Sequence, residues 1–211
     1  MPAPAETTDA RMSFWRLETF SDSIFAVAMT LLVFSFPLSS LPADISEAGI
    51  TTLLQGLGPQ FETFIISFVV VGAFWMAHHR TFDNIKHYDR GIVWLNFLFL
   101  LLIVFTPFPT AILVRGTYWL SVAFYATTIA GAGFVLTLVW FYASYHHRLI
   151  DKAMPTWEIR ARTVSALVNP SIFLLSIVIA LYSPRLAMYS WLLSFVAQWA
   201  VTRQWQKSKA Y

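Results

Sequence analysis

The stretch "RLETFSDSIFAVAMTLLVF", residues 16–34, decides the fold class, because it is apolar enough to enter a bilayer although its first turns are charged. A helix needs about 20 mostly apolar residues to cross the hydrocarbon core of a membrane. Five further stretches of this kind follow along the chain. The sequence therefore predicts an all-α polytopic membrane protein with six transmembrane helices. We expect these helices at residues 12–37, 58–79, 91–114, 117–145, 163–182 and 186–203.

The composition agrees with a membrane protein. Of the 211 residues, 57% are hydrophobic and only 12% are charged, whereas roughly a quarter are charged in soluble domains. The chain contains no cysteine, which excludes disulfides and thiolate metal sites. The histidine pairs at 78–79 and 146–147 lack a carboxylate at metal-site spacing, so we expect no metal and no cofactor. No catalytic triad, paired carboxylates or phosphate-binding glycine loop occurs, so we do not expect an enzyme.

The positive charges predict the orientation in the membrane. Of the fourteen Lys and Arg residues, only Arg115 and Arg185 fall on the side opposite the two termini. Because Lys and Arg concentrate on the cytoplasmic side, we expect a multi-pass protein of the cell (inner or plasma) membrane with both termini cytoplasmic. This role explains the net charge of +3 without a nucleic-acid partner. We expect a disordered tail at 1–10, a six-helix domain at 11–205 and a cytoplasmic tail at 206–211.

Prolines and polar residues divide the predicted helices further. Pro107 and Pro109 should kink the third helix, and Pro170 lies inside the fifth, because proline interrupts the helical hydrogen-bond ladder. The longest outer connection contains "GITTLLQGL", residues 49–57, which could form a short amphipathic helix at the membrane interface. Asn96 in the third helix is expected to form a hydrogen bond between helices.

A helical wheel of the first helix separates an aliphatic face from an acidic one. Glu18 and Asp22 lie together, on nearly the opposite side from the aliphatic face. An aspartate in a membrane helix is costly unless it is paired, so we expect Asp22 to face its own subunit, near His78, His79 or Arg80. The wheel alone leaves open what the other face contacts: lipid, a protein core or a pore. The residues of this aliphatic face are Arg16, Phe20, Ser23, Val27, Leu31 and Phe34.

Three motifs resemble those of a known family. They are "R-x-x-x-F-S-D" at residues 16–22, "W-x-x-H-H-R-x-F" at 75–82 and "L-N…F-x-P-F-P-T" at 95–110. In this order, on the first three predicted helices, they resemble the bacterial branch of the transmembrane protein 175 family of endosomal and lysosomal potassium channels. The resemblance implies a structural motif network that contains Arg16, Phe20, Ser21, Asp22, His78 and His79.

The resemblance also implies a fold and a function. It implies a homotetramer of six-helix subunits in membrane lipid, permeable to potassium and other monovalent cations, with the first helix lining a central pore. In this family an aliphatic constriction begins five residues after the motif aspartate, which here is Val27, followed by Leu31 and Phe34. This constriction stands in place of the carbonyl selectivity filter of ordinary potassium channels. The chain indeed lacks T-V-G-Y-G, the sequence that forms such a filter. Ser23 and Thr30 are candidate ion contacts, although we expect each hydroxyl to bond the carbonyl four residues back.

Two other functions stay open beside the channel. One is a proton- or cation-coupled secondary transporter that uses Asp22 and the histidines. Transporters usually hold their polar site near the bilayer midplane, whereas these polar groups lie near one end of the helices, so the channel is favoured. The other is a structural membrane protein whose first-helix face packs against partners. For the channel we expect a modest preference for potassium over sodium. The sequence does not decide which of the three levels, Val27, Leu31 or Phe34, is the narrowest.

Overall fold

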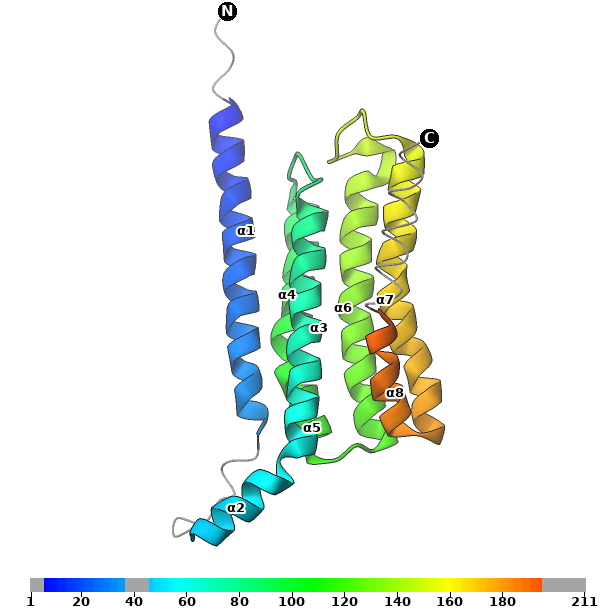
Figure 1. The fold of residues 1–211 in the computed structure, drawn as a ribbon. Coiled ribbons are helices and arrows are strands. Elements are labelled where there is room, and N and C mark those ends of the chain that lie inside the picture. The colour runs from blue at the N-terminus through cyan, green and yellow to red at the C-terminus, as the bar shows by residue number, and fades with distance from the viewer. Residues whose placement is uncertain (1–5, 37–45, 195–211) are drawn as a thin grey trace, which may run out of the picture.

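The computed structural model describes residues 6–36 and 46–194, with residues 6–14 described by their backbone alone. The chain forms a bundle of long helices, with α1 on one side, α3, α4 and α5 in the middle, and α6, α7 and α8 on the other side (Figure 1). The elements are α1 (Glu6–Leu31), the 3-10 helix η1 (Leu32–Ser35), α2 (Glu47–Gly56), α3 (Gly58–Phe82), α4 (Arg90–Phe105), α5 (Pro107–Arg115), α6 (Trp119–Ser144), the 3-10 helix η3 (Tyr145–His147), α7 (Thr156–Tyr182) and α8 (Pro184–Ser190).

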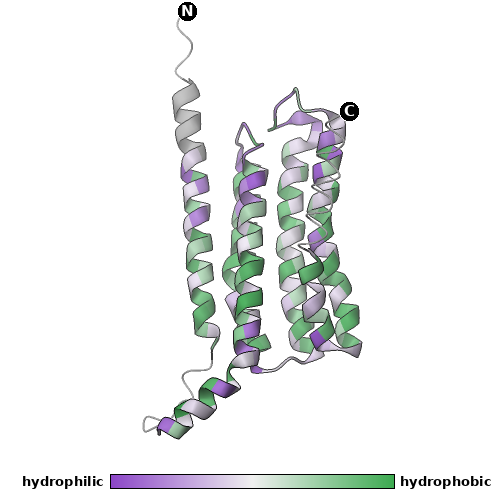
Figure 2. Ribbon diagram, in the orientation of Figure 1, coloured by the Kyte–Doolittle hydropathy of each residue, from purple (hydrophilic) through white to green (hydrophobic). Residues whose placement is uncertain are grey.

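Five helical segments within the described residues are long and apolar enough to cross a membrane. They confirm the first five predicted spans, and Figure 2 shows their hydrophobic colour along the bundle. The predicted sixth span, 186–203, begins within α8, but its residues 195–203 lie outside the described part of the chain. The count of six therefore stays a prediction. The five segments are Trp15–Ser35, Gly58–Phe82, Arg90–Arg115, Trp119–His147 and Thr156–Tyr182.

Two helices begin earlier than the sequence predicts. α1 begins at Glu6, so residues 6–10 of the expected disordered tail are helical, while 1–5 and 206–211 lie outside the described residues. α7 begins at Thr156 rather than at residue 163. Its first turns are polar, and the salt bridge between Glu158 and Arg162, 2.9 Å long, stabilises them at an i, i+4 spacing. A search for long apolar stretches does not detect a helix that begins with polar turns.

The prolines of the third span interrupt it as expected. The helix ends at Phe105, Thr106 follows, and α5 begins at Pro107. Within α7, by contrast, Pro170 leaves the helix continuous. Because Pro170 has no N–H, the carbonyl of Ala166 loses its usual donor. The Thr137 hydroxyl of α6 lies 3.1 Å from that carbonyl oxygen and 2.8 Å from the Gly133 carbonyl oxygen of its own helix, so its single proton is shared between the two acceptors.

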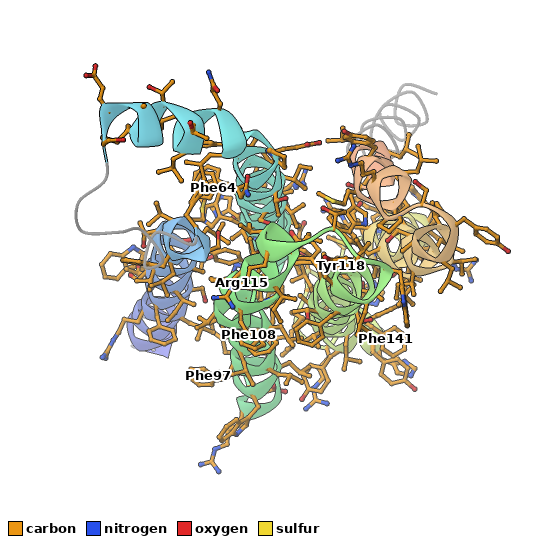
Figure 3. The ribbon with its side chains drawn as sticks, turned by 90° about the horizontal axis from the view of Figure 1, so that it is seen from below. Phe64, Phe97, Phe108, Arg115, Tyr118 and Phe141 are labelled. Atoms are coloured by element: carbon orange, nitrogen blue, oxygen red, sulfur yellow. The ribbon has the colours of Figure 1, made fainter. Side chains whose placement is uncertain are left out.

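The core of the subunit forms around α6. This helix packs against α3, α4, α5, α7 and α8, and most of its residues are buried. α1 packs through one side only, against α3, α4 and α5, so it lies at the edge of the subunit. Seen from below, α1 and α7 lie on opposite sides of the bundle (Figure 3).

The loops at one end of the bundle are joined to each other. Ile85 and Ile150 form an antiparallel bridge between the α3–α4 loop and the α6–α7 loop. The Lys86 N–H donates to the Leu149 carbonyl oxygen over 2.7 Å. We call this end, which has Lys86 and Arg148 in its loops, the basic end. The predicted amphipathic helix is present as α2 at the opposite end, and its place at a membrane interface stays a prediction.

Candidate functional site

One face of α1 is attached to the subunit. Ser21, Phe25, Ala28 and Leu32 are between 0% and 1% exposed, and their spacing of four, three and four residues places them on one side of the helix. The Phe25 ring lies 5.9 Å from the ring of Phe99 in α4. These contacts fix the rotation of α1 about its own axis and thereby determine which residues it turns outward.

A buried chain of hydrogen bonds connects α1, α4 and α3. The Asn96 amide nitrogen donates to the Ser21 hydroxyl over 3.0 Å, and the Asn96 oxygen lies 2.9 Å from Nε2 of His78. All three side chains are buried, and the His78 ring stacks with Phe82, at 4.2 Å between centroids, and with Phe99, at 5.5 Å. The expected inter-helix role of Asn96 is confirmed. Because buried polar groups are costly without partners, this network favours a single arrangement of the three helices.

The expected partners of Asp22 were wrong. Its carboxylate accepts a hydrogen bond from the indole Nε1 of Trp75, over 2.8 Å, and not from His78, His79 or Arg80. Trp75 lies one helical turn before His79 and reaches the level of Asp22. His78 follows Trp75 by three residues, so its side chain projects about 300° further around the helix axis. It therefore points into the core, toward Asn96.

The other two expected partners also have different contacts. The His79 ring stacks on Trp75 at 6.1 Å between centroids, and its Nε2 lies 3.8 Å from the Asp83 carboxylate. The Arg80 Nε donates to the carbonyl of Met76. Asp22 is thus held by its own subunit, as the sequence predicts, through a tryptophan that sequence reasoning did not consider as a donor.

The aliphatic face of α1 is left open. Val27 is 50% exposed, Leu31 36% and Phe34 78%, although all three are large and apolar. Arg16 and Phe20 are exposed on the same side, and the Phe20 ring meets Phe97 of α4, labelled in Figure 3, at 5.8 Å. Beyond the contact at Phe20, the described residues of the subunit leave Val27 and Phe34 at least half exposed.

Two hydroxyl groups lie on the exposed side of α1. Ser23 donates to the carbonyl of Thr19, four residues back, over 2.9 Å, as expected. Thr30 donates over 2.8 Å to the carbonyl of Val27, which is only three residues back. Each hydroxyl oxygen keeps its acceptor capacity on the outer surface of the helix, where it could meet a cation.

The second histidine pair belongs to a loop and not to this site. His146 and His147 adopt left-handed backbone angles in η3, and Nε2 of His147 lies 2.9 Å from the Met154 carbonyl oxygen. Within residues 6–36 and 46–194, no group of three or more His, Asp or Glu side chains is arranged to hold a metal ion.

A further polar cluster at the basic end was not found from the sequence. Asp89 caps α4 by accepting from the Ile92 N–H, and it also accepts from the Tyr142 hydroxyl, over 2.9 Å, and from Arg148, over 2.8 Å. Partial burial raises the pKa of Asp89, but these hydrogen bonds and the Arg148 charge outweigh it and hold the pKa below its ordinary value. The cluster joins the two loops of the basic end.

Comparisons with known proteins agree with the motifs. Residues 16–107 match the family described as endosomal/lysosomal potassium channel TMEM175. A protein named a potassium channel from Chamaesiphon minutus is 28% identical over 82% of this chain and 87% of its own length. A crystal structure of a lysosomal potassium-selective channel TMEM175 homolog, also from Chamaesiphon minutus, superposes with a TM-score of 0.76 and 25% identity, covering 90% of this chain and 98% of that one.

A mouse relative has a different name. It is called an endosomal/lysosomal proton channel, and it is 33% identical over 42% of this chain and 19% of its own length. The fold, the motifs and these matches define a multi-pass membrane protein from a class of ion channels, not of enzymes. The chain is similar to the TMEM175 family through residues 16–107, and to a bacterial potassium channel along most of its length.

Proposed function

We propose that this protein is a potassium channel whose pore is lined by α1 from each of four identical subunits. The family match and the bacterial relative named a potassium channel support this function. The observation that carries the proposal is the exposure of Val27, Leu31 and Phe34 on a helix whose opposite face is held in place by buried hydrogen bonds. Around a symmetry axis, four such faces would form a narrow apolar ring.

The constriction would work by controlling water. A pore lined by rings of Val27, Leu31 and Phe34 excludes water when it is narrow, and a small widening admits water and ions together. Phe34, 78% exposed, is the largest of the three side chains, and it would form the outermost ring. Opening therefore requires only a small rotation or displacement of α1.

Selectivity would be modest in such a pore. An ion that passes a dry ring sheds part of its hydration shell, and potassium does so at a lower cost than sodium. No carbonyl ring replaces the lost water, so the discrimination depends on dehydration and on the oxygens of Ser23 and Thr30 nearby. We propose both termini on the cytoplasmic side, at the basic end, because the loops there hold most of the positive charge.

The mouse relative's name favours a second candidate ion, the proton. A wetted ring would also let protons pass along a chain of water molecules. A transporter that uses Asp22 receives less support, because its carboxylate is already bonded to Trp75.

Reconstituted protein in liposomes tests the proposal through potassium, sodium and proton fluxes. We expect Val27→Asn to hydrate the ring, to raise the fluxes and to bring the potassium-to-sodium ratio close to 1. Val178→Asn is the matched control, because Val178 is 57% exposed on α7, on the far side of the subunit. If both variants keep the parent flux ratio, or if both change it equally, α1 does not line the pore.

A further inference from the structure

The last turn of the first membrane span is not α-helical. α1 ends at Leu31, and the next 4 residues form the 3-10 helix η1, which includes Phe34. A 3-10 helix turns by about 120° per residue, whereas an α-helix turns by about 100°. The direction of Phe34 about the helix axis therefore depends on which helical form this turn adopts.

The two helical forms point Phe34 at different parts of the exposed face of α1. Between Leu31 and Phe34 the two forms differ by about 60° of rotation. As a 3-10 turn, η1 places Phe34 above Leu31, whereas an α-helical turn would place it near the line of Val27 and Thr30. Leu31, 36% exposed, borders the attached side of α1, while Val27 is 50% exposed. The 3-10 form thus holds Phe34 at the edge of the open face, and the α form would move it to the centre.

The Ser35 hydroxyl favours the 3-10 form. It donates to the Leu32 carbonyl oxygen over 2.6 Å, and the Phe36 N–H donates to the Val33 carbonyl oxygen, three residues back, over 3.3 Å. In an α-helix the Phe36 N–H would instead donate to Leu32, four residues back. The Ser35 hydroxyl therefore competes for the acceptor that the α form needs. Both Leu32 and Ser35 are buried, so water does not replace this hydrogen bond.

The turn is anchored on its own subunit, while Phe34 is free to move. η1 packs on α3 and α5, and the Phe36 ring that follows it lies 4.9 Å from the ring of Phe61 and 5.5 Å from that of Phe64, both in α3. Phe34, by contrast, is 78% exposed. A change of helical form in η1 therefore turns the Phe34 side chain while the buried network at Ser21 still holds the rest of α1.

We propose that η1 switches between 3-10 and α-helical forms and thereby controls the end of the pore opposite the basic end. In the 3-10 form of this structure, Phe34 lies to one side. In the α form the Phe34 rings of the subunits turn toward the axis, narrow the pore and exclude water. The Ser35 hydroxyl stabilises the wider form. This inference rests on the proposed function, because it requires α1 around the pore, and it adds the segment that moves.

Potassium flux into liposomes tests the switch with a pair of serine variants of the full chain. We expect Ser35→Ala to lower the flux several-fold, because the Phe36 N–H then bonds the Leu32 carbonyl and the α form becomes more populated. Ser190→Ala is the matched control, because this hydroxyl also donates three residues back, to the Ala187 carbonyl over 2.7 Å, but in α8, across the bundle from α1 (Figure 1). It should keep the parent flux. Equal fluxes in the two variants overturn the switch.

Two further variants show whether Ser35 acts through Phe34. Phe34→Ala removes the ring that the switch moves, so it should raise the flux, and adding Ser35→Ala to it should change the flux no further. A several-fold loss in the double variant would mean that Ser35→Ala damages the protein in another way, which overturns the proposal. If Phe34→Ala and Val27→Asn both keep the parent flux, α1 does not line the pore and the proposed function fails. If both raise the flux while Ser35→Ala matches Ser190→Ala, only the switch fails.

Discussion

Among the five membrane-length segments of the described residues, those of α1 and α7 are the least buried, and they expose different chemistry. In the apolar segment of each, 22% of the residues are buried, against 67% for α6. The exposed face of α7 is almost wholly large and aliphatic, as a lipid-facing surface should be. The exposed face of α1 alternates apolar residues with small and hydroxylated ones, including Thr19, Ser23, Ala26 and Thr30. The large exposed aliphatic residues of α7 are Val164, Leu167, Leu174, Leu175, Val178, Ile179 and Leu181, and the aromatic Trp157 and Tyr182 are exposed at its two ends.

The two helices also differ in how they are held. α1 is joined to its subunit by side chains that bond across three helices, Ser21, Asn96 and His78. α7 follows α6 closely along its length and is bonded to it through Thr137 and the Ala166 carbonyl. Exposure alone therefore does not distinguish a pore from lipid. The difference lies in the hydroxyls on the outer face of α1 and in the buried polar network behind it.

The largest stability effect should follow from breaking the network behind α1. Asn96→Leu leaves the His78 ring buried without its partner, which should cost about 1–3 kcal/mol in the free energy of unfolding. Ser23→Ala is the control on the exposed face of the same helix and should leave stability nearly unchanged. Unfolding in detergent micelles measures both. A loss as small for Asn96→Leu as for Ser23→Ala would mean that the network does not hold α1.

A smaller effect is expected where α7 is joined to α6. Thr137→Val removes the donor to the Ala166 carbonyl beside Pro170, and hydrogen bonds between membrane helices contribute about 0.6 kcal/mol on average. Thr128→Val is the matched control, because the Thr128 hydroxyl bonds only the Phe124 carbonyl of its own helix. The difference between the two unfolding free energies measures the inter-helix bond. No difference would show that the Ala166 carbonyl does not depend on Thr137.

The smallest effect concerns the loop cluster at the basic end. Because the Asp89 pKa lies below its ordinary value, the ionised carboxylate stabilises the fold above pH of about 4, and this stabilisation is lost as the pH falls through the lowered pKa. Asp89→Asn keeps a helix-capping side chain and removes only the charge. Melting temperatures from pH 6 to pH 3 should fall less steeply in this variant than in the parent protein. Identical slopes would exclude a role for the Asp89–Arg148 pair.

The sequence predicted the spans well because long apolar runs follow directly from the thickness of a bilayer. It also placed Val27, Leu31 and Phe34 on one face, which the structure leaves exposed. It did not predict that His78 pairs with Asn96. That contact depends on how α3 is rotated about its own axis, whereas the sequence indicates only the depth of each residue in the membrane. The early start of α7 was missed because its first turns are stabilised by a salt bridge and not by apolar residues.

The absence of cysteine from the chain allows a direct test of what α1 faces. Val27→Cys and Val178→Cys are reconstituted separately and treated with a charged, membrane-impermeant thiol reagent while potassium flux is recorded. Only a thiol that meets water ionises and reacts. We predict rapid loss of flux in Val27→Cys and no reaction in Val178→Cys. An unreactive Val27→Cys, or one that is labelled without any change in flux, would contradict a pore lined by α1.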